Sequence, residues 1–140
     1  MKKALLFFSL CFCLATASNA QVTFGVGGTY VNDLGVQARA NLDLTETIGL
    51  IPSFSYYFSD PGTVISLDAN ATYNLTTIGD DMPLYGLAGL DYTRVSFAGA
   101  SDSEIGLNVG AGTNIGNIYA EIFYRTTYSG DIGINVGYMF

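Results

Sequence analysis

Six charged side chains are the residues of this chain with the clearest capacity for chemistry. They occupy alternating positions within apolar stretches: Arg39, Asp43, Asp68, Asp91, Glu121 and Arg125. Neighbouring carboxylates can perform acid–base chemistry, or they can form ion pairs with arginines. The ion-pair interpretation is favoured, because the sequence has no histidine and its two cysteines lie at positions 11 and 13. Without histidine no Ser-His-Asp triad or His-based metal site can form, so we expect no catalytic residue, metal or cofactor.

The first 20 residues have the pattern of a leader rather than of a folded element. Two lysines precede an apolar run over 4–15, and small residues follow at 18 and 20. This order is typical of a secretory signal cut after Ala20, and the run is shorter than the roughly 20 residues of a spanning helix. A lipoprotein signal at one of the cysteines is the disfavoured alternative. We therefore predict a cleaved signal peptide over 1–20 and one domain over 21–140.

The predicted mature chain is acidic and poor in basic groups. Without the two leader lysines it keeps three arginines and all 12 acids, so its formal charge changes from −7 to −9. Nucleic-acid affinity comes mainly from Lys and Arg on phosphates, and no nucleic-acid partner is expected. No apolar run in the sequence is long enough for a helical span. A closed barrel of strands is then the remaining way to cross a membrane.

Eight segments alternate apolar with polar or small residues, which is the period of a strand with one apolar face. Most segments have about 10 residues, the length that a tilted strand needs to cross a bilayer. Gly116 and Asn117 form a two-residue hairpin turn, and the longest links are predicted over 76–83 and 95–103. An even number of strands with paired ends removes the sheet edges. The segments lie at 22–30, 34–44, 50–58, 65–75, 84–93, 104–115, 118–125 and 132–140.

The two mid-strand arginines decide which face of these segments meets lipid. An arginine facing the bilayer midplane costs roughly 2–4 kcal/mol, so Arg39, Arg125 and the acids on the same face are predicted to point inward. The opposite face then carries aromatic residues near both rims, where their rings favour the membrane interfaces. This girdle comprises Tyr30, Tyr56, Phe58, Tyr92 and Tyr124 near one rim and Phe24, Tyr73, Tyr138 and Phe140 near the other.

The last nine residues carry a more specific pattern. Apolar residues alternate from 132 onward, and the chain ends on Val136, Tyr138 and Phe140 at every second position. This ending resembles the C-terminal insertion signal of bacterial outer-membrane β-barrels. Together with the leader and the eight segments, it makes residues 21–140 similar to the small barrels of the OmpA/OmpX transmembrane type. One departure is that such barrels usually carry long extracellular loops, whereas every link here is short.

The resemblance implies an all-β fold, an eight-stranded antiparallel up-and-down transmembrane β-barrel in the bacterial outer membrane. It also implies contact with outer-membrane lipid and lipopolysaccharide, and recognition of the C-terminal strand by the barrel-assembly machinery. We expect a monomer without enzymatic activity.

The inward charges are predicted to close the lumen, because an eight-stranded barrel is just wide enough for side chains to fill. The protein is then a structural or interaction component of the outer membrane. A narrow, cation-preferring channel for ions or very small solutes is the alternative, since the inward acids outnumber the two arginines. Arg94 lies just above Tyr92 on the lipid-facing side and is a candidate contact for a lipid phosphate, with an ordinary solvated rim as the alternative.

Overall fold

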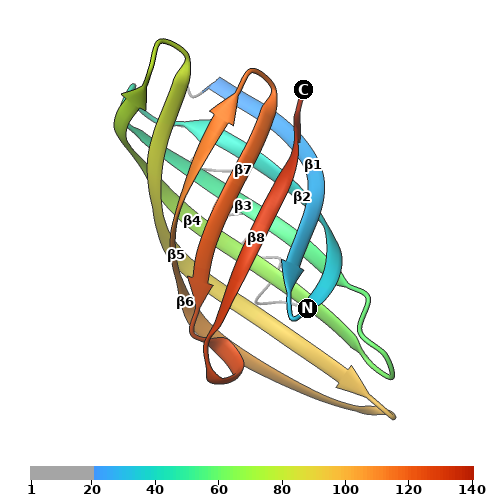
Figure 1. Cartoon of the computed structure of the whole chain (residues 1–140). Coiled ribbons are helices and arrows are strands. Elements are labelled where there is room, and N and C mark those ends of the chain that lie inside the picture. The colour runs from blue at the N-terminus through green and yellow to red at the C-terminus, as the bar shows by residue number, and fades with distance from the viewer. Residues whose placement is uncertain (1–20) are drawn as a thin grey trace.

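A computed structural model describes residues 21–140 and folds them into one closed antiparallel barrel (Figure 1). Each strand pairs with the next one in sequence, and β1 pairs with β8 to close the barrel. The predicted eight-stranded up-and-down barrel is confirmed, and the predicted signal peptide lies outside the described residues. The strands are β1 (Gln21–Val31), β2 (Asp33–Asp43), β3 (Ile48–Tyr57), β4 (Thr63–Ile78), β5 (Met82–Phe97), β6 (Ala100–Ile115), β7 (Ile118–Arg125) and β8 (Asp131–Met139).

The only helical element of the described barrel is the short 3-10 helix η1 (Thr127–Ser129), which joins β7 to β8. Within residues 21–140, no helix has the length and apolar character to span a membrane. We call the end of the barrel that carries η1 the η1 end, and the opposite end, where β1 starts and β8 stops, the terminal end.

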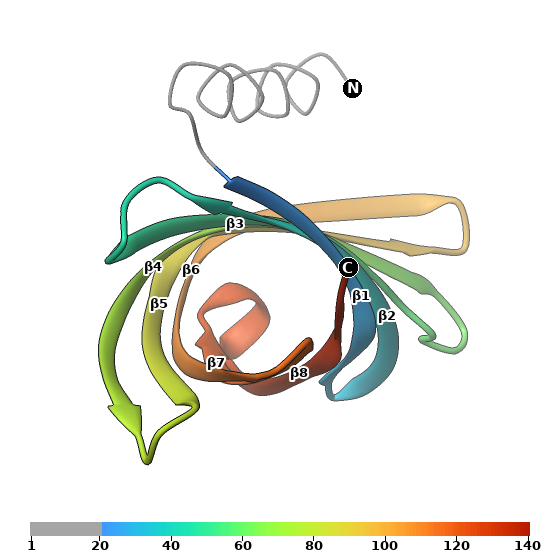
Figure 2. The same ribbon diagram turned by 90° about the horizontal axis from the view of Figure 1, so that it is seen from above.

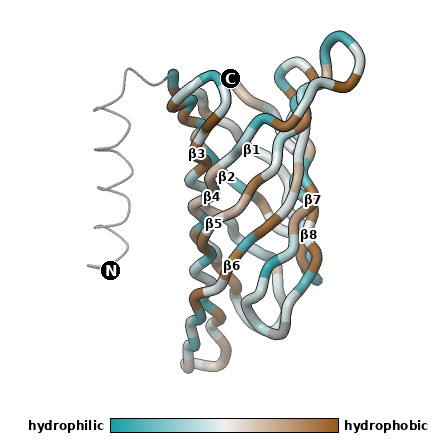
Figure 3. The backbone as a smooth tube through the Cα atoms, turned by 90° about the vertical axis from the view of Figure 1, so that its left-hand side faces the viewer, coloured by the Kyte–Doolittle hydropathy of each residue, from teal (hydrophilic) through white to brown (hydrophobic). Residues whose placement is uncertain are grey.

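Alternation along each strand separates an inward polar face from an outward apolar face. In β3, Ser53 and Tyr57 are buried, whereas Phe54 is exposed. Strand pairing places the inward residues of neighbouring strands side by side, since Ser53 opposes Arg39 on β2 and Asp68 on β4. Hydrophobic and hydrophilic residues accordingly alternate along the backbone in Figure 3.

Three strands are longer than the sequence predicted. β4, β5 and β6 have 16 residues each, so the links predicted over 76–83 and 95–103 are wrong in extent. Paired strands satisfy each other's backbone N–H and C=O groups beyond the apolar band, and pairing therefore continues until the chain must reverse. The reversals use positive φ at Gly79 (66°) and at Ala98 and Gly99 (49° and 83°). The two hairpins project from opposite ends of the barrel (Figure 1).

Candidate functional site

One polar cluster spans the lumen from β2 to β7, and we call it the Arg39 cluster. Arg39 Nη2 lies 2.5 Å from Glu121 Oε1, and both side chains are only 2% exposed. Glu121 also accepts hydrogen bonds from Tyr85 OH at 2.7 Å and from Asn135 Nδ2 at 3.0 Å. The Arg39 guanidinium lies over the Tyr119 ring, 4.1 Å from its centroid, in a cation–π contact. Side chains from β2, β5, β7 and β8 therefore meet in one buried layer.

A second cluster, the Arg125 cluster, lies nearer the η1 end. Arg125 Nη2 is 3.4 Å from Asp68 Oδ1, and its Nε is 3.4 Å from Asp91 Oδ2. The two aspartates are direct neighbours on β4 and β5, and both are buried. One cation thus faces two acids, and neutral donors complete the shell around them, which offsets the cost of removing carboxylates from water. These donors are Ser53, Ser66, Thr93, Asn108 and Thr127.

The η1 segment folds across the η1 end of the lumen, within the outline of the barrel in Figure 2. Thr127 is 2% exposed, and its Oγ1 donates to Asp91 Oδ2 at 2.6 Å. The next residue, Tyr128, donates from its backbone N–H to Glu104 Oε2 at 2.9 Å. Burial, followed by the nearby carboxylates of Asp102 and Glu104, raises the pKa of Tyr128 above its usual value. The lumen therefore ends at this side in an anchored turn with a neutral phenol.

Three cavities lie along the described lumen. The cavity between the two clusters has a volume of about 10 Å³, the space of a single water molecule. A cavity of about 140 Å³ at the η1 end is lined by Arg125 and Tyr128, among others. A cavity of about 60 Å³ toward the terminal end is lined by Asn41 and Tyr85, among others. The smallest of these three cavities lies between the two ionic clusters.

Aromatic rings fill much of the remaining lumen, and they lie across from glycines. Tyr85 opposes Gly112, where a Cβ atom would lie 2.7 Å from the ring. Phe123 opposes Gly110 on β6 and Gly133 on β8. The missing side chains of these glycines provide the space that the rings occupy. The inward aromatic residues Tyr57, Tyr85, Tyr119 and Phe123 are all buried.

Five of the six charged residues predicted for the lumen lie in the two clusters: Arg39, Asp68, Asp91, Glu121 and Arg125. Asp43 belongs to neither, which corrects its predicted place in the network. It is the last residue of β2, where the strand leaves the packed part of the lumen, and it is exposed. The neutral donors were not assigned from the sequence, although small polar residues at inward positions were the available signal. Nothing in the sequence indicated that Thr127, outside any strand, reaches Asp91.

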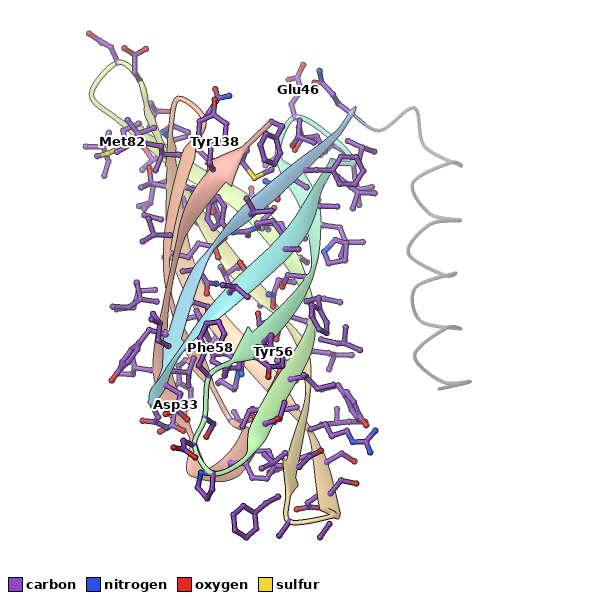
Figure 4. All side chains as sticks on the ribbon, turned by 90° about the vertical axis from the view of Figure 1, so that its right-hand side faces the viewer. Asp33, Glu46, Tyr56, Phe58, Met82 and Tyr138 are labelled. Carbon is purple, nitrogen blue, oxygen red and sulfur yellow. The ribbon has the colours of Figure 1, made fainter. Side chains whose placement is uncertain are left out.

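The predicted girdle residues point outward near both ends of the barrel. At the η1 end Tyr56 and Phe58 make an edge-to-face contact with ring centroids 5.6 Å apart. Tyr138 and Phe140 make the same contact at the terminal end, also at 5.6 Å. Figure 4 shows Tyr56 and Phe58 near Asp33 at one end, and Tyr138 toward the other end with Glu46 and Met82. Of the other girdle residues, Phe24, Tyr30, Tyr73 and Tyr124 are exposed and Tyr92 is half-buried.

The C-terminal residues complete the wall of the barrel. Val136, Tyr138 and Phe140 are exposed on the outward face, and the Phe140 N–H donates to the Phe24 carbonyl oxygen at 2.8 Å. Arg94 is exposed on β5, one outward position beyond Tyr92 toward the η1 end. These three alternate residues are thus part of the outer surface. Met139, between Tyr138 and Phe140, instead lies on the inner side, where its sulfur and the Arg39 side chain both adjoin Gly25.

Solved structures of small outer-membrane barrels share this architecture. The N-terminal β-barrel domain of Pseudomonas aeruginosa OprF matches with a TM-score of 0.64 and 21% identity, over 88% of this chain and 98% of that domain. Neisserial surface protein A matches with a TM-score of 0.55 and 17% identity, over 85% of this chain and 96% of that one. Ail, the attachment invasion locus protein of Yersinia pestis, matches with a TM-score of 0.52 and 18% identity, over 86% of this chain and 99% of that one. The chain has the fold of these barrels.

The fold agrees with the predicted resemblance to the OmpA/OmpX type. No protein-family model matches the sequence, and the search of curated proteins gave no match. At these identities the likeness establishes architecture, and the role must be argued from the molecule's own surfaces and lumen.

Proposed function

We propose that this protein is an integral barrel of the bacterial outer membrane, with a lumen closed by side chains and a structural or interaction role. The outer surface supports the membrane location, because large apolar side chains cover it. Ile105 is 70% exposed, Leu107 is 59% exposed and Ile132 is 66% exposed. Exposed apolar area on this scale is stabilised by lipid and would promote aggregation in water.

In the proposed function, the protein has a defined route into the membrane and a defined orientation there. The predicted leader exports the chain, and Tyr138 and Phe140 at the end of β8 are the segment that the barrel-assembly machinery would recognise. Antiparallel barrels of this kind place their chain ends on the periplasmic side, so the η1 end faces outward. The proposal assigns the protein no enzymatic activity.

The Arg39 cluster is the observation that carries the closed-lumen part of the proposal. Its ion pair is 2% exposed on both sides, and its partners come from strands all around the barrel. A conducting pore needs a continuous column of water, whereas the cavity beside this layer holds about 10 Å³. Ion passage would require Arg39 and Glu121 to separate within a buried environment, which is costly.

A narrow cation-preferring channel is the second candidate function. The Arg125 cluster favours it, because two aspartates face one arginine and the site carries one more acid than base. Such an excess attracts cations into a lumen. The Arg39 cluster and the small central cavity favour the closed barrel over this candidate.

Single-channel conductance in a planar bilayer separates the two candidates. We expect no conductance steps above background from the purified protein. Reproducible steps with cation preference, reduced by Asp68→Asn or Asp91→Asn, would overturn the closed-lumen proposal. Glu46→Gln is the control, because it neutralises one exposed acid that lines none of the three lumen cavities described above. Recovery of the protein in the outer-membrane fraction of a Gram-negative host tests the location separately.

A further inference from the structure

The outward face of β4, β5 and β6 near the η1 end places a cation among hydroxyl groups. Arg94 and Ser96 are successive outward residues of β5, and Ser96 pairs with Thr63 on β4 and Ser101 on β6. Arg94 Nη2 donates to Ser101 Oγ at 3.2 Å. These four residues, which we call the Arg94 cradle, line a groove of about 400 Å³ whose other walls are 61–62 and 97–100.

Most N–H donors of the Arg94 guanidinium have no hydrogen-bond partner in the described barrel. The other two arginines are buried, so Arg94 is the one exposed basic side chain of the described barrel. The ion pairs within residues 21–140 do not include it. Asp102 and Glu104 occupy the alternate positions of β6, and Glu104 turns to the Tyr128 N–H instead. A guanidinium has five N–H donors, and the one hydrogen bond to Ser101 leaves most of them available.

The cradle lies at the edge of the apolar band. One outward position toward the barrel centre, Tyr92 pairs with Leu67 on β4 and with Ile105 on β6. Arg94 itself pairs with apolar Ile65 on β4 and with Ser103 on β6, and the next outward set, Thr63, Ser96 and Ser101, is hydroxyl-bearing. The change from apolar to polar side chains therefore falls at the level of Arg94. In a spanning barrel this is the level at which acyl chains give way to headgroups.

We propose that the Arg94 cradle binds a phosphate group of an outer-leaflet lipid, the phosphorylated headgroup of lipopolysaccharide. Arginine presents a planar fork of donors that matches phosphate oxygens, and the hydroxyls of Thr63, Ser96 and Ser101 can donate to the remaining ones. A lipid is preferred over a soluble phosphate because the groove adjoins the apolar band and exposed Phe97. The inference rests on the proposed membrane location and names a ligand for this surface.

Lipid binding by the protein purified in detergent from a Gram-negative host, whichever cell fraction holds it, tests the cradle. Native mass spectrometry would count bound diphosphoryl lipid A and, in parallel, lipid A from which both phosphates have been removed. We expect the wild type to prefer the phosphorylated lipid by about tenfold or more, the range of a charge-assisted contact. Arg94→Gln should abolish the preference and Arg94→Lys should retain part of it. Asp33→Asn, a charge change at the η1 end outside the groove, should leave it intact.

The outcomes that overturn the inference are distinct from failure of the proposed location. An unchanged preference in Arg94→Gln, or no preference in the wild type, shows that the cradle is not a phosphate site. If millimolar inorganic phosphate displaces the bound lipid A, the ligand of the cradle is a soluble anion. That result would overturn the lipid assignment. Absence of the wild type from the outer-membrane fraction contradicts the proposed function, while binding in detergent still reports on the cradle.

Discussion

Glu121→Ala should destabilise the barrel far more than removal of an exposed acid. The substitution deletes the only carboxylate that contacts Arg39 among the described residues. Arg39 Nε and Nη1 already have no hydrogen-bond partner there. The guanidinium would remain buried against the Tyr119 ring without an anion. Breaking one side of a buried ion pair in this way costs about 3–5 kcal/mol of unfolding free energy.

The hydrogen bonds that Glu121 accepts from Tyr85 and Asn135 do not add their full value to this cost. One hydrogen bond to a charged acceptor makes a net contribution of about 1.5–3 kcal/mol to the unfolding free energy. After the substitution, however, both donors adjoin space left by the missing side chain, and water can enter it from the cavity of about 60 Å³ that Tyr85 lines. We therefore expect a total loss of about 3–5 kcal/mol of unfolding free energy. Asp43→Ala, at the exposed end of β2, should change stability by less than about 0.5 kcal/mol.

Urea titration of the protein in phospholipid vesicles, followed by circular dichroism, measures these differences. The chain has no tryptophan, so the β-sheet signal is the more direct observable. A double replacement by apolar residues, Arg39→Met with Glu121→Leu, should lie within about 2 kcal/mol of the wild type, because no unpaired charge remains. The single variants Arg39→Met and Glu121→Leu complete the cycle, and the coupling energy between the two sites should then be at least about 2 kcal/mol.

Additive effects, with each single substitution below about 1 kcal/mol, would refute this reasoning. Water-exposed ion pairs fall in that range. Such a result would show that water reaches Arg39 and Glu121 and that the lumen is open, in favour of the channel.

Three further predictions test the facing of the strands, the packing of the lumen and the η1 anchor. Ala38→Arg, on the outward face, should destabilise the protein in vesicles by roughly 2–4 kcal/mol, whereas Ala38→Leu should be tolerated. Gly112→Ala should cost about 1–3 kcal/mol in the urea titration, because its Cβ would lie 2.6 Å from the Glu121 side chain; Gly28→Ala, whose nearest neighbour is 3.9 Å away, is the matched control. Thr127→Val removes the donor to Asp91 and should make the turn at η1 susceptible to added protease, and unchanged protection would contradict the proposed anchor.

The sequence by itself determined the strand periodicity, the closed antiparallel fold and the direction of most side chains. Strand periodicity and side-chain direction are local properties, because alternate residues of any strand point to opposite faces. The closed fold followed from the eight segments together with the resemblance that they and the last residues carry. Arg39 and Arg125 identified the inward face without knowledge of the tertiary structure. Gly116 marked a tight turn, and the structure places it at φ 60° between the paired Ile115 and Ile118.

Only the tertiary structure decided which acid meets which arginine. Arg39 and Glu121 are 82 residues apart, and their contact across the lumen depends on barrel closure and strand register together. The same holds for Thr127, which reaches Asp91 only because the chain after β7 folds inward. Alternation indicates that a side chain points inward. It gives neither the position of that side chain along the barrel axis nor its neighbour across the lumen. Those depend on the relative placement of all eight strands, which no local pattern contains.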